Sequence, residues 1–99
     1  MTKIKELAES IIDELESAKK YAEKYVECKA KGNTQWASRF KEMSEDELRH
    51  AMYLHEYAVK EIEELKVVYT PPEDMLEKWD KKHKEYVEKS ALVKQMLTL

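Results

Sequence analysis

Hydrophobic residues recur along this chain at intervals of three and four, the spacing that places side chains on one side of an α-helix. The pattern predicts three helices, over about residues 3–31, 35–66 and 71–97. Gly32 suits the left-handed conformation that ends a helix, and the run Thr70-Pro71-Pro72-Glu73 combines a capping box with a proline at the first helical position. Strand signals are absent, so the predicted fold class is all-α.

The junctions between the predicted helices are short. Short junctions favour antiparallel neighbours, so the first two helices should form a long hairpin with the third, C-terminal helix packed beside it. Residues 1–99 should form a single domain, because a chain of this size buries too little surface for several cores. Only 1 Gly and 2 Pro occur beside 39% charged residues, a composition typical of long, exposed helices.

The middle of the second predicted helix carries polar residues where apolar ones are expected. Its apolar stripe contains Trp36, Phe40, Met43, Leu54, Ala58, Ile62 and Leu65. Glu47 and His50 fall within that stripe, although the opposite side of the helix has ample room for charged residues. Glu14 is the only acid on the inner side of the first predicted helix. All three side chains are therefore expected to point inward.

An inward cluster of this kind favours a bound cation. A buried carboxylate without a partner is strongly disfavoured, so Glu14 and Glu47 should be paired, protonated or bound to a positive ion. His50 favours the ion, because residues three apart on a helix present their ligand atoms to the same point. Carboxylate with imidazole suits iron, manganese or zinc, and the lack of a nearby thiolate argues against a closed structural zinc site.

The same residues resemble a half-site of the ferritin-like di-iron carboxylate proteins, which include the rubrerythrins. Those proteins place a Glu on one bundle helix and a Glu-x-x-His on the next, usually twice per site. The interval from Glu14 to Glu47, the position of Tyr21 seven residues after Glu14, and the run Glu45-Asp46-Glu47-Leu48-Arg49-His50-Ala51 are all similar to a rubrerythrin-type half-site. This chain carries one such set.

Encapsulated ferritins resemble the chain most closely in architecture, with a long hairpin, one further helix and a di-iron site across a dimer interface. The resemblance implies a ferritin-like four-helix bundle completed by dimerisation, in a homodimer or a higher homo-oligomer. It also implies that Glu47 bridges two irons per dimer, with Glu14 and His50 as terminal ligands, in a ferroxidase that oxidises Fe(II) with dioxygen or peroxide. An encapsulin shell is the further partner implied, although residues 90–99 resemble a helix end more than the flexible targeting tail of encapsulin cargo.

Other interpretations of these residues remain open. Ser44 and Glu47 also match a capping box, which would start a new helix at this point. His50 could instead be a core histidine in a dry hydrogen-bond network with Glu14 or Tyr21, in a non-enzymatic helical homodimer or interaction module. Manganese or zinc in place of iron would give a metal-binding dimer with a structural or hydrolytic role.

Charge and hydropathy narrow the set of partners. The net charge is −3 with both signs interspersed, so the broad basic field of a nucleic-acid binder is missing. No stretch approaches the roughly 20 apolar residues of a membrane span, and the first residues lack the apolar core of a secretory signal. A cytoplasmic location without nucleic-acid or membrane partners is therefore expected, or an encapsulin nanocompartment if the resemblance extends that far.

Two further histidines are not included in the predicted ligand set. His83 falls among Trp79, Tyr86 and Val93 on the inner side of the third predicted helix, where a lone histidine is more often a packing residue. His55 lies off the central stripe of the second predicted helix.

Overall fold

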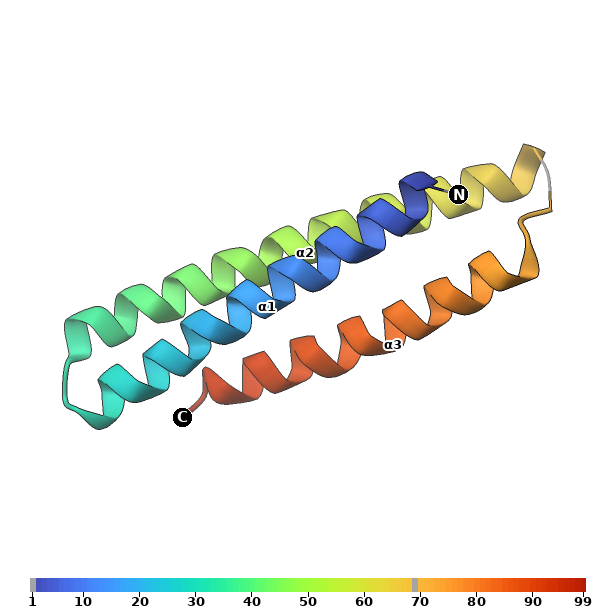
Figure 1. Ribbon diagram of the computed structural model, residues 1–99. Coiled ribbons are helices and arrows are strands. Elements are labelled where there is room, and N and C mark those ends of the chain that lie inside the picture. Colours follow the sequence, from blue (N-terminus) through green and yellow to red (C-terminus); the bar gives the residue numbers. More distant parts are fainter. Residues whose placement is uncertain (1, 69) are drawn as a thin grey trace.

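The computed structural model describes residues 2–68 and 70–99, and these residues form helices and no strand. The helices are α1 (Thr2–Ala30), α2 (Thr34–Val68) and α3 (Glu73–Met96). α1 and α2 form an antiparallel hairpin and α3 lies beside it, in a rod that measures 55 × 18 × 17 Å (Figure 1). The predicted all-α fold class is confirmed. None of the helices in the described part of the chain has the length and apolar character that a membrane crossing requires.

The reversal between α1 and α2 follows from two residues. Gly32 has a φ of +77°, a left-handed conformation that glycine adopts at little cost. Its N–H donates to the Lys29 carbonyl at 3.1 Å and the N–H of Asn33 donates to the Cys28 carbonyl at 2.9 Å, which is the Schellman arrangement of a helix end. The side-chain oxygen of Asn33 then accepts a 3.3 Å hydrogen bond from the backbone N–H of Trp36 and caps α2.

α3 begins after both prolines rather than at the first one. Pro72 occupies the position before the helix, with φ −57° and ψ 140°, and none of the described side chains makes a capping hydrogen bond there. The predicted capping box at Thr70 is therefore wrong. Because a residue that precedes a proline is pushed out of the helical region, Pro71 stays outside the helix. Glu73 and Asp74 instead place negative charge near the positive end of the helix dipole.

The contact between α1 and α2 is built from small side chains. The buried small residues of this seam are Ala18 and Ala22 on α1 and Ala37, Ser44, Ala51 and Ala58 on α2. Such residues let two helix axes approach closely. The buried hydroxyl of Ser44 donates a 2.7 Å hydrogen bond to the Ala18 carbonyl oxygen, so the close contact leaves this polar group satisfied.

The apolar stripe predicted for the second helix coincides with the buried row only in part: Ala58 and Ile62 are buried as expected, but the N-terminal part of the stripe is not. Trp36 is 48% exposed and Met43 is 37% exposed, whereas Ala37 and Ser44, each one position further on, are buried. The prediction was wrong at these positions because it gave large apolar residues more weight than alanines. Close helix packing selects small residues for the seam and displaces large ones to its edge.

α3 packs mainly along α1 and covers one side of the hairpin. Its C-terminal part is held by Val93 and Leu97, which are 1% and 5% exposed and pack against the alanines of the seam. Trp79 near its N-terminus and Tyr86 near its middle pack against the core around Leu15. The helix is therefore anchored by Val93 and Leu97 at its C-terminal end, and by the buried Met75 and the two aromatic rings in the rest of its length.

Enlarging a seam alanine tests the close contact. Ala51 is 0% exposed, so Ala51→Leu should lower the free energy of unfolding by about 1–3 kcal/mol through overpacking. Urea unfolding followed by circular dichroism measures the change. The same substitution at Ala91, which is exposed on α3, serves as the control and should change the free energy of unfolding by less than about 0.5 kcal/mol. Equal stability of the two variants would contradict the seam.

Candidate metal centre

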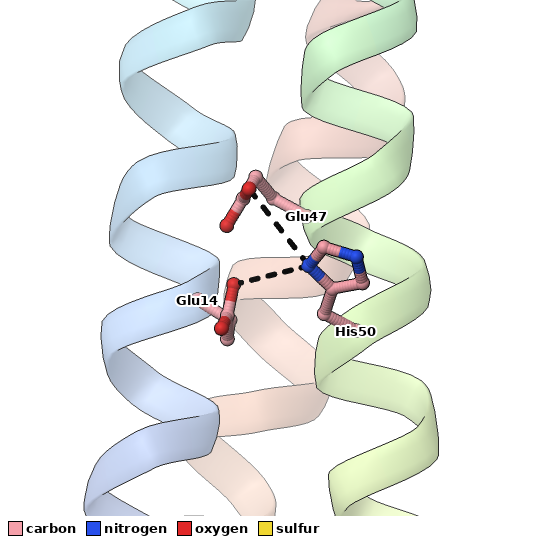
Figure 2. Close-up of side chains that lie close together, drawn as sticks. All are labelled: Glu14, Glu47 and His50. Atoms are coloured by element: carbon pink, nitrogen blue, oxygen red, sulfur yellow. Dashed lines mark ion pairs between the residues drawn. The ribbon is translucent and has the colours of Figure 1, made fainter.

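Two carboxylates and an imidazole meet between α1 and α2. Glu14 extends from α1, and Glu47 and His50 extend from neighbouring turns of α2 (Figure 2). One ligand atom from each residue lies within 4.8 Å of the other two. In the described residues this is the only group of three or more His, Cys, Asp or Glu side chains that is close enough to hold one ion.

The imidazole of His50 stands at a similar distance from both carboxylates. Its Nδ1 lies 3.6 Å from Glu14 Oε2 and 3.8 Å from Glu47 Oε1. Both separations are longer than a hydrogen bond. The dry network that was the alternative for His50 is therefore not formed with Glu14 in the single chain, and the three groups surround a common point instead.

The three groups lie at the rim of the seam rather than in the interior. The exposed fractions of the side chains are 30% for Glu14, 23% for Glu47 and 52% for His50. Of the three side chains expected to point inward, Glu14 and Glu47 are partly buried and His50 is exposed in the single chain. The buried alanines, Ile11 and Leu15 fill the interior between the helices, so the three polar side chains emerge beside it. The ribbon of α3 passes behind the site in Figure 2, on the other side of the hairpin.

α2 presents Glu47 and His50 together because it is continuous. The helix runs from Thr34 to Val68 and passes through Ser44 without a break. Ser44 is buried and its hydroxyl donates to α1, so the alternative in which Ser44 starts a new helix is wrong. On a continuous helix, residues three apart project to the same side, which gives one oxygen donor and one nitrogen donor at the same place.

The Glu14 carboxyl group disfavours the ionisation of Glu47. The pKa of Glu47 is raised above its ordinary value, first by the hydrogen bond that its carboxyl group shares with Glu14, then by burial and by the negative charge of Glu14. The positive form of His50 acts on this pKa in the opposite direction. A bound cation would remove the repulsion between the carboxylates.

The donor set fits a divalent transition metal. Carboxylate oxygen and imidazole nitrogen are ligands of iron, manganese and zinc, and three protein ligands leave coordination positions open. Cys28 is the only cysteine of the chain, and it is not part of the group. The arrangement is therefore that of a mixed oxygen and nitrogen site, and it differs from a structural zinc site closed by thiolates.

Apolar side chains lie on both sides of the cluster of Glu14, Glu47 and His50 along the hairpin. We call this surface the open face; it comprises Leu7, Glu14, Tyr21 and Cys28 on α1 and Trp36, Phe40, Met43, Glu47, His50, Leu54 and Tyr57 on α2. The rings of Tyr21 and Phe40 stack across the two helices, with their centroids 6.4 Å apart. Trp36 and Tyr57 are 48% and 44% exposed, so much of this face is in contact with solvent in the single chain.

A second pair of polar side chains was not predicted from the sequence. His55 of α2 and His83 of α3 face each other, with Nε2 and Nδ1 2.8 Å apart. His83 was expected to be a lone packing residue, but it has a partner. The spacing of the histidines indicated that His55 does not share the surface of His50. His55 lies five residues after His50 and therefore points about 140° away from it around the helix.

Comparison with known families agrees with this geometry. A family model described as Rubrerythrin matches residues 5–96, which places the fold and the carboxylate and histidine cluster in a ferritin-like protein. The chain belongs to the rubrerythrin family, whose members typically bind iron. Searches of curated proteins and of solved structures gave no match. The resemblance to the rubrerythrins seen in the sequence is thus confirmed.

Removal of one carboxylate should stabilise the metal-free protein. Because the pKa of Glu47 is raised in the folded state, its ionisation costs stability above the ordinary Glu pKa and costs nothing at acidic pH. Glu14→Gln removes the repelling charge, so the melting temperature at neutral pH should rise by about 1–3 °C, a modest shift because the site is partly solvated. Calorimetry in the presence of a chelator measures it.

The gain in melting temperature should shrink as the pH falls through the ordinary Glu pKa and disappear well below it, at about pH 3, where Glu47 is protonated in both proteins. Glu9→Gln, which changes an exposed acid on the same helix, is the matched control and should not raise the melting temperature. A drop in melting temperature for Glu14→Gln at neutral pH would show that Glu14 stabilises the fold and does not strain it.

Proposed function

We propose that this chain is an iron-binding ferritin-like protein whose di-iron site forms between two subunits and acts as a ferroxidase. The observation that carries the proposal is the convergence of Glu14, Glu47 and His50 on the open face. Ferritin-like di-iron sites take a Glu from each of two helices and a Glu-x-x-His from each of two others. One chain offers half of that set, and a second copy related by a two-fold axis would supply the rest.

The surroundings of the cluster support a site shared by two chains. Three helices leave a four-helix bundle incomplete, and the open face carries exposed apolar side chains on both sides of the cluster. Burial of such a surface against its symmetry copy would release water from apolar groups, which drives association. The same contact would exclude water from His50, whose side chain is half exposed in the single chain.

The residues of the chain then have distinct tasks. Glu14, Glu47 and His50 would hold Fe(II), and hard carboxylate oxygens favour the ferric product over the ferrous substrate. Two ferrous ions together supply the two electrons that reduce dioxygen to peroxide, or peroxide to water. The open face would keep the pair of ions in one place, with coordination positions free for the oxidant.

Assembly beyond the dimer follows from the same reasoning. A dimer of 99-residue chains encloses no volume for iron mineral, so storage would require a higher homo-oligomer or a separate shell. An encapsulin shell is the partner that the resemblance to encapsulated ferritins implies. Two other functions predict different behaviour: a non-enzymatic helical dimer would bind no iron, and a zinc or manganese dimer would take up metal without consuming oxygen.

Iron titration tests the activity. Anaerobic addition of Fe(II) followed by air should produce near-ultraviolet absorbance that saturates at two irons per dimer, with consumption of oxygen. Glu47→Gln keeps the size of the side chain and removes a charged ligand, so it should weaken iron binding by more than about tenfold. Glu42→Gln changes an exposed acid of the same helix and should leave the titration unchanged. Saturation at the same iron content in both variants would contradict the proposed ligands.

Matched lysine substitutions test the dimer. Met43 on the open face and Met52 elsewhere on α2 have similar exposure, 37% and 41%, so a charge at either is tolerated equally well by a single chain. Met43→Lys should dissociate the dimer because it places a charge in the interface, whereas Met52→Lys should leave it intact. Analytical ultracentrifugation measures the masses. A monomeric native protein, or dissociation by Met52→Lys alone, would contradict an interface on the open face.

A further inference from the structure

A pair of histidines joins α3 to α2 on the side of the hairpin away from the metal cluster. His55 Nε2 lies 2.8 Å from His83 Nδ1, and the two rings stack with their centroids 4.9 Å apart. The His55 ring also lies parallel to the Tyr86 ring at 4.4 Å and close to the Trp79 ring at 5.7 Å. α3 packs mainly along α1, and its contact with α2 is small. These rings therefore make up a principal part of the contact between α3 and α2.

A hydrogen bond between two imidazoles has a limited capacity for protons. One ring nitrogen must donate and the other must accept, so the pair can be neutral or can share a single proton. When both rings are protonated, all of their nitrogens are donors and both rings carry positive charge. The second proton therefore breaks the hydrogen bond and replaces it with repulsion across the contact between α2 and α3.

The surroundings of the pair do little to compensate for positive charge. α1 contributes Ala8 and Ile11 to this cluster, and both are apolar. α3 contributes Lys82, which adds positive charge and is itself paired with Glu85 at 3.5 Å. α2 contributes the carboxylate of Glu56 as an opposing influence.

The pKa shifts of His55 and Tyr86 agree with this distribution of charge around the pair. Burial lowers the pKa of His55, the neighbouring His83 lowers it further, and Glu56 raises it. The pKa of Tyr86 is raised by burial, so its hydroxyl stays neutral. The docked state therefore resists protonation of His55.

We infer that the His55 and His83 pair is an acid-released latch, which holds the N-terminal half of α3 against α2 at neutral pH and lets it open when both rings are protonated. The far end of α3 stays anchored, since Val93 and Leu97 lie in the apolar core. Opening is thus confined to the part of α3 that contains Trp79, His83 and Tyr86. The metal cluster uses neither histidine and lies on another side of α2, so the latch works without iron.

The direction of the pH dependence follows from proton uptake on opening. Undocked histidines bind protons near their ordinary pKa, whereas the docked pair binds at most one, so opening takes up at least one proton. Docking is therefore fully stable above the ordinary His pKa and weakens as the pH falls below it. One proton gives a tenfold change per pH unit, so between about pH 7.5 and about pH 5 the opening equilibrium should rise about thirtyfold.

Hydrogen exchange on the metal-free full chain tests the latch. Mass spectrometry at about pH 7.5 and about pH 5, corrected for intrinsic exchange rates, should show about thirtyfold more opening for residues 75–88 at the lower pH. Residues 90–96 of the same helix are the internal control and should show less than a threefold change. The double variant His55→Phe with His83→Phe keeps stacked rings that cannot titrate, so its pH dependence should vanish. The same rise in this variant, or no rise in the native protein, overturns the latch.

Histidine NMR on the native chain keeps the test decisive if the double variant fails to fold. The chain has three histidines, so His55 and His83 can be followed beside His50. His55 should take up its proton below the ordinary His pKa and in step with the opening of α3. Full protonation of both rings while residues 75–88 remain protected overturns the latch. Opening of these residues while both rings remain neutral does so as well.

Discussion

The close contact of α1 with α2 is the constraint on which the rest of the structure depends. Alanines and one serine line the seam beside the buried side chains of Ile11 and Leu15, and the Ser44 hydroxyl is satisfied by the Ala18 carbonyl oxygen. Other large residues, such as Trp36, Met43 and Tyr57, lie exposed at the rim of the seam. The cluster of Glu14, Glu47 and His50 lies at one rim, on the open face, and α3 packs on the other side of the hairpin (Figure 2).

The position of the carboxylates carries an electrostatic cost in the metal-free protein. Glu14 and Glu47 come from different helices, so the hairpin itself brings them together, and Glu14 raises the pKa of Glu47. Either acid would be solvated easily elsewhere on its helix. This repulsion, at a surface rich in exposed apolar side chains, supports the proposed binding of a cation and of a second chain, because selection for stability alone would remove the repulsion.

Much of the fold and the identity of the cluster could be predicted from the sequence. The period of apolar residues and the Gly32 signal depend on local chemistry, so they identified the helices and the first reversal, and the Glu-x-x-His spacing identified the cluster. The buried side of α2 could not be predicted in this way, because alanine and serine carry little hydropathy signal although they decide how close two helices pack. The capping box failed because backbone restriction at two successive prolines outweighs a side-chain cap.

The pairing of His55 with His83 could not be predicted from the sequence either, for a different reason. Each histidine looks like an ordinary packing residue in its own helix, and their meeting depends on the register of α3 against the hairpin, which local periodicity does not determine. The structure therefore separates two histidine chemistries on one helix. His50 faces the carboxylates, whose negative charge suits a cation, while His55 is partly buried against a second imidazole, and both the burial and the second ring disfavour a positive charge on it. The turn of about 140° between them lets α2 serve a metal cluster on one side and a proton-sensitive contact on the other.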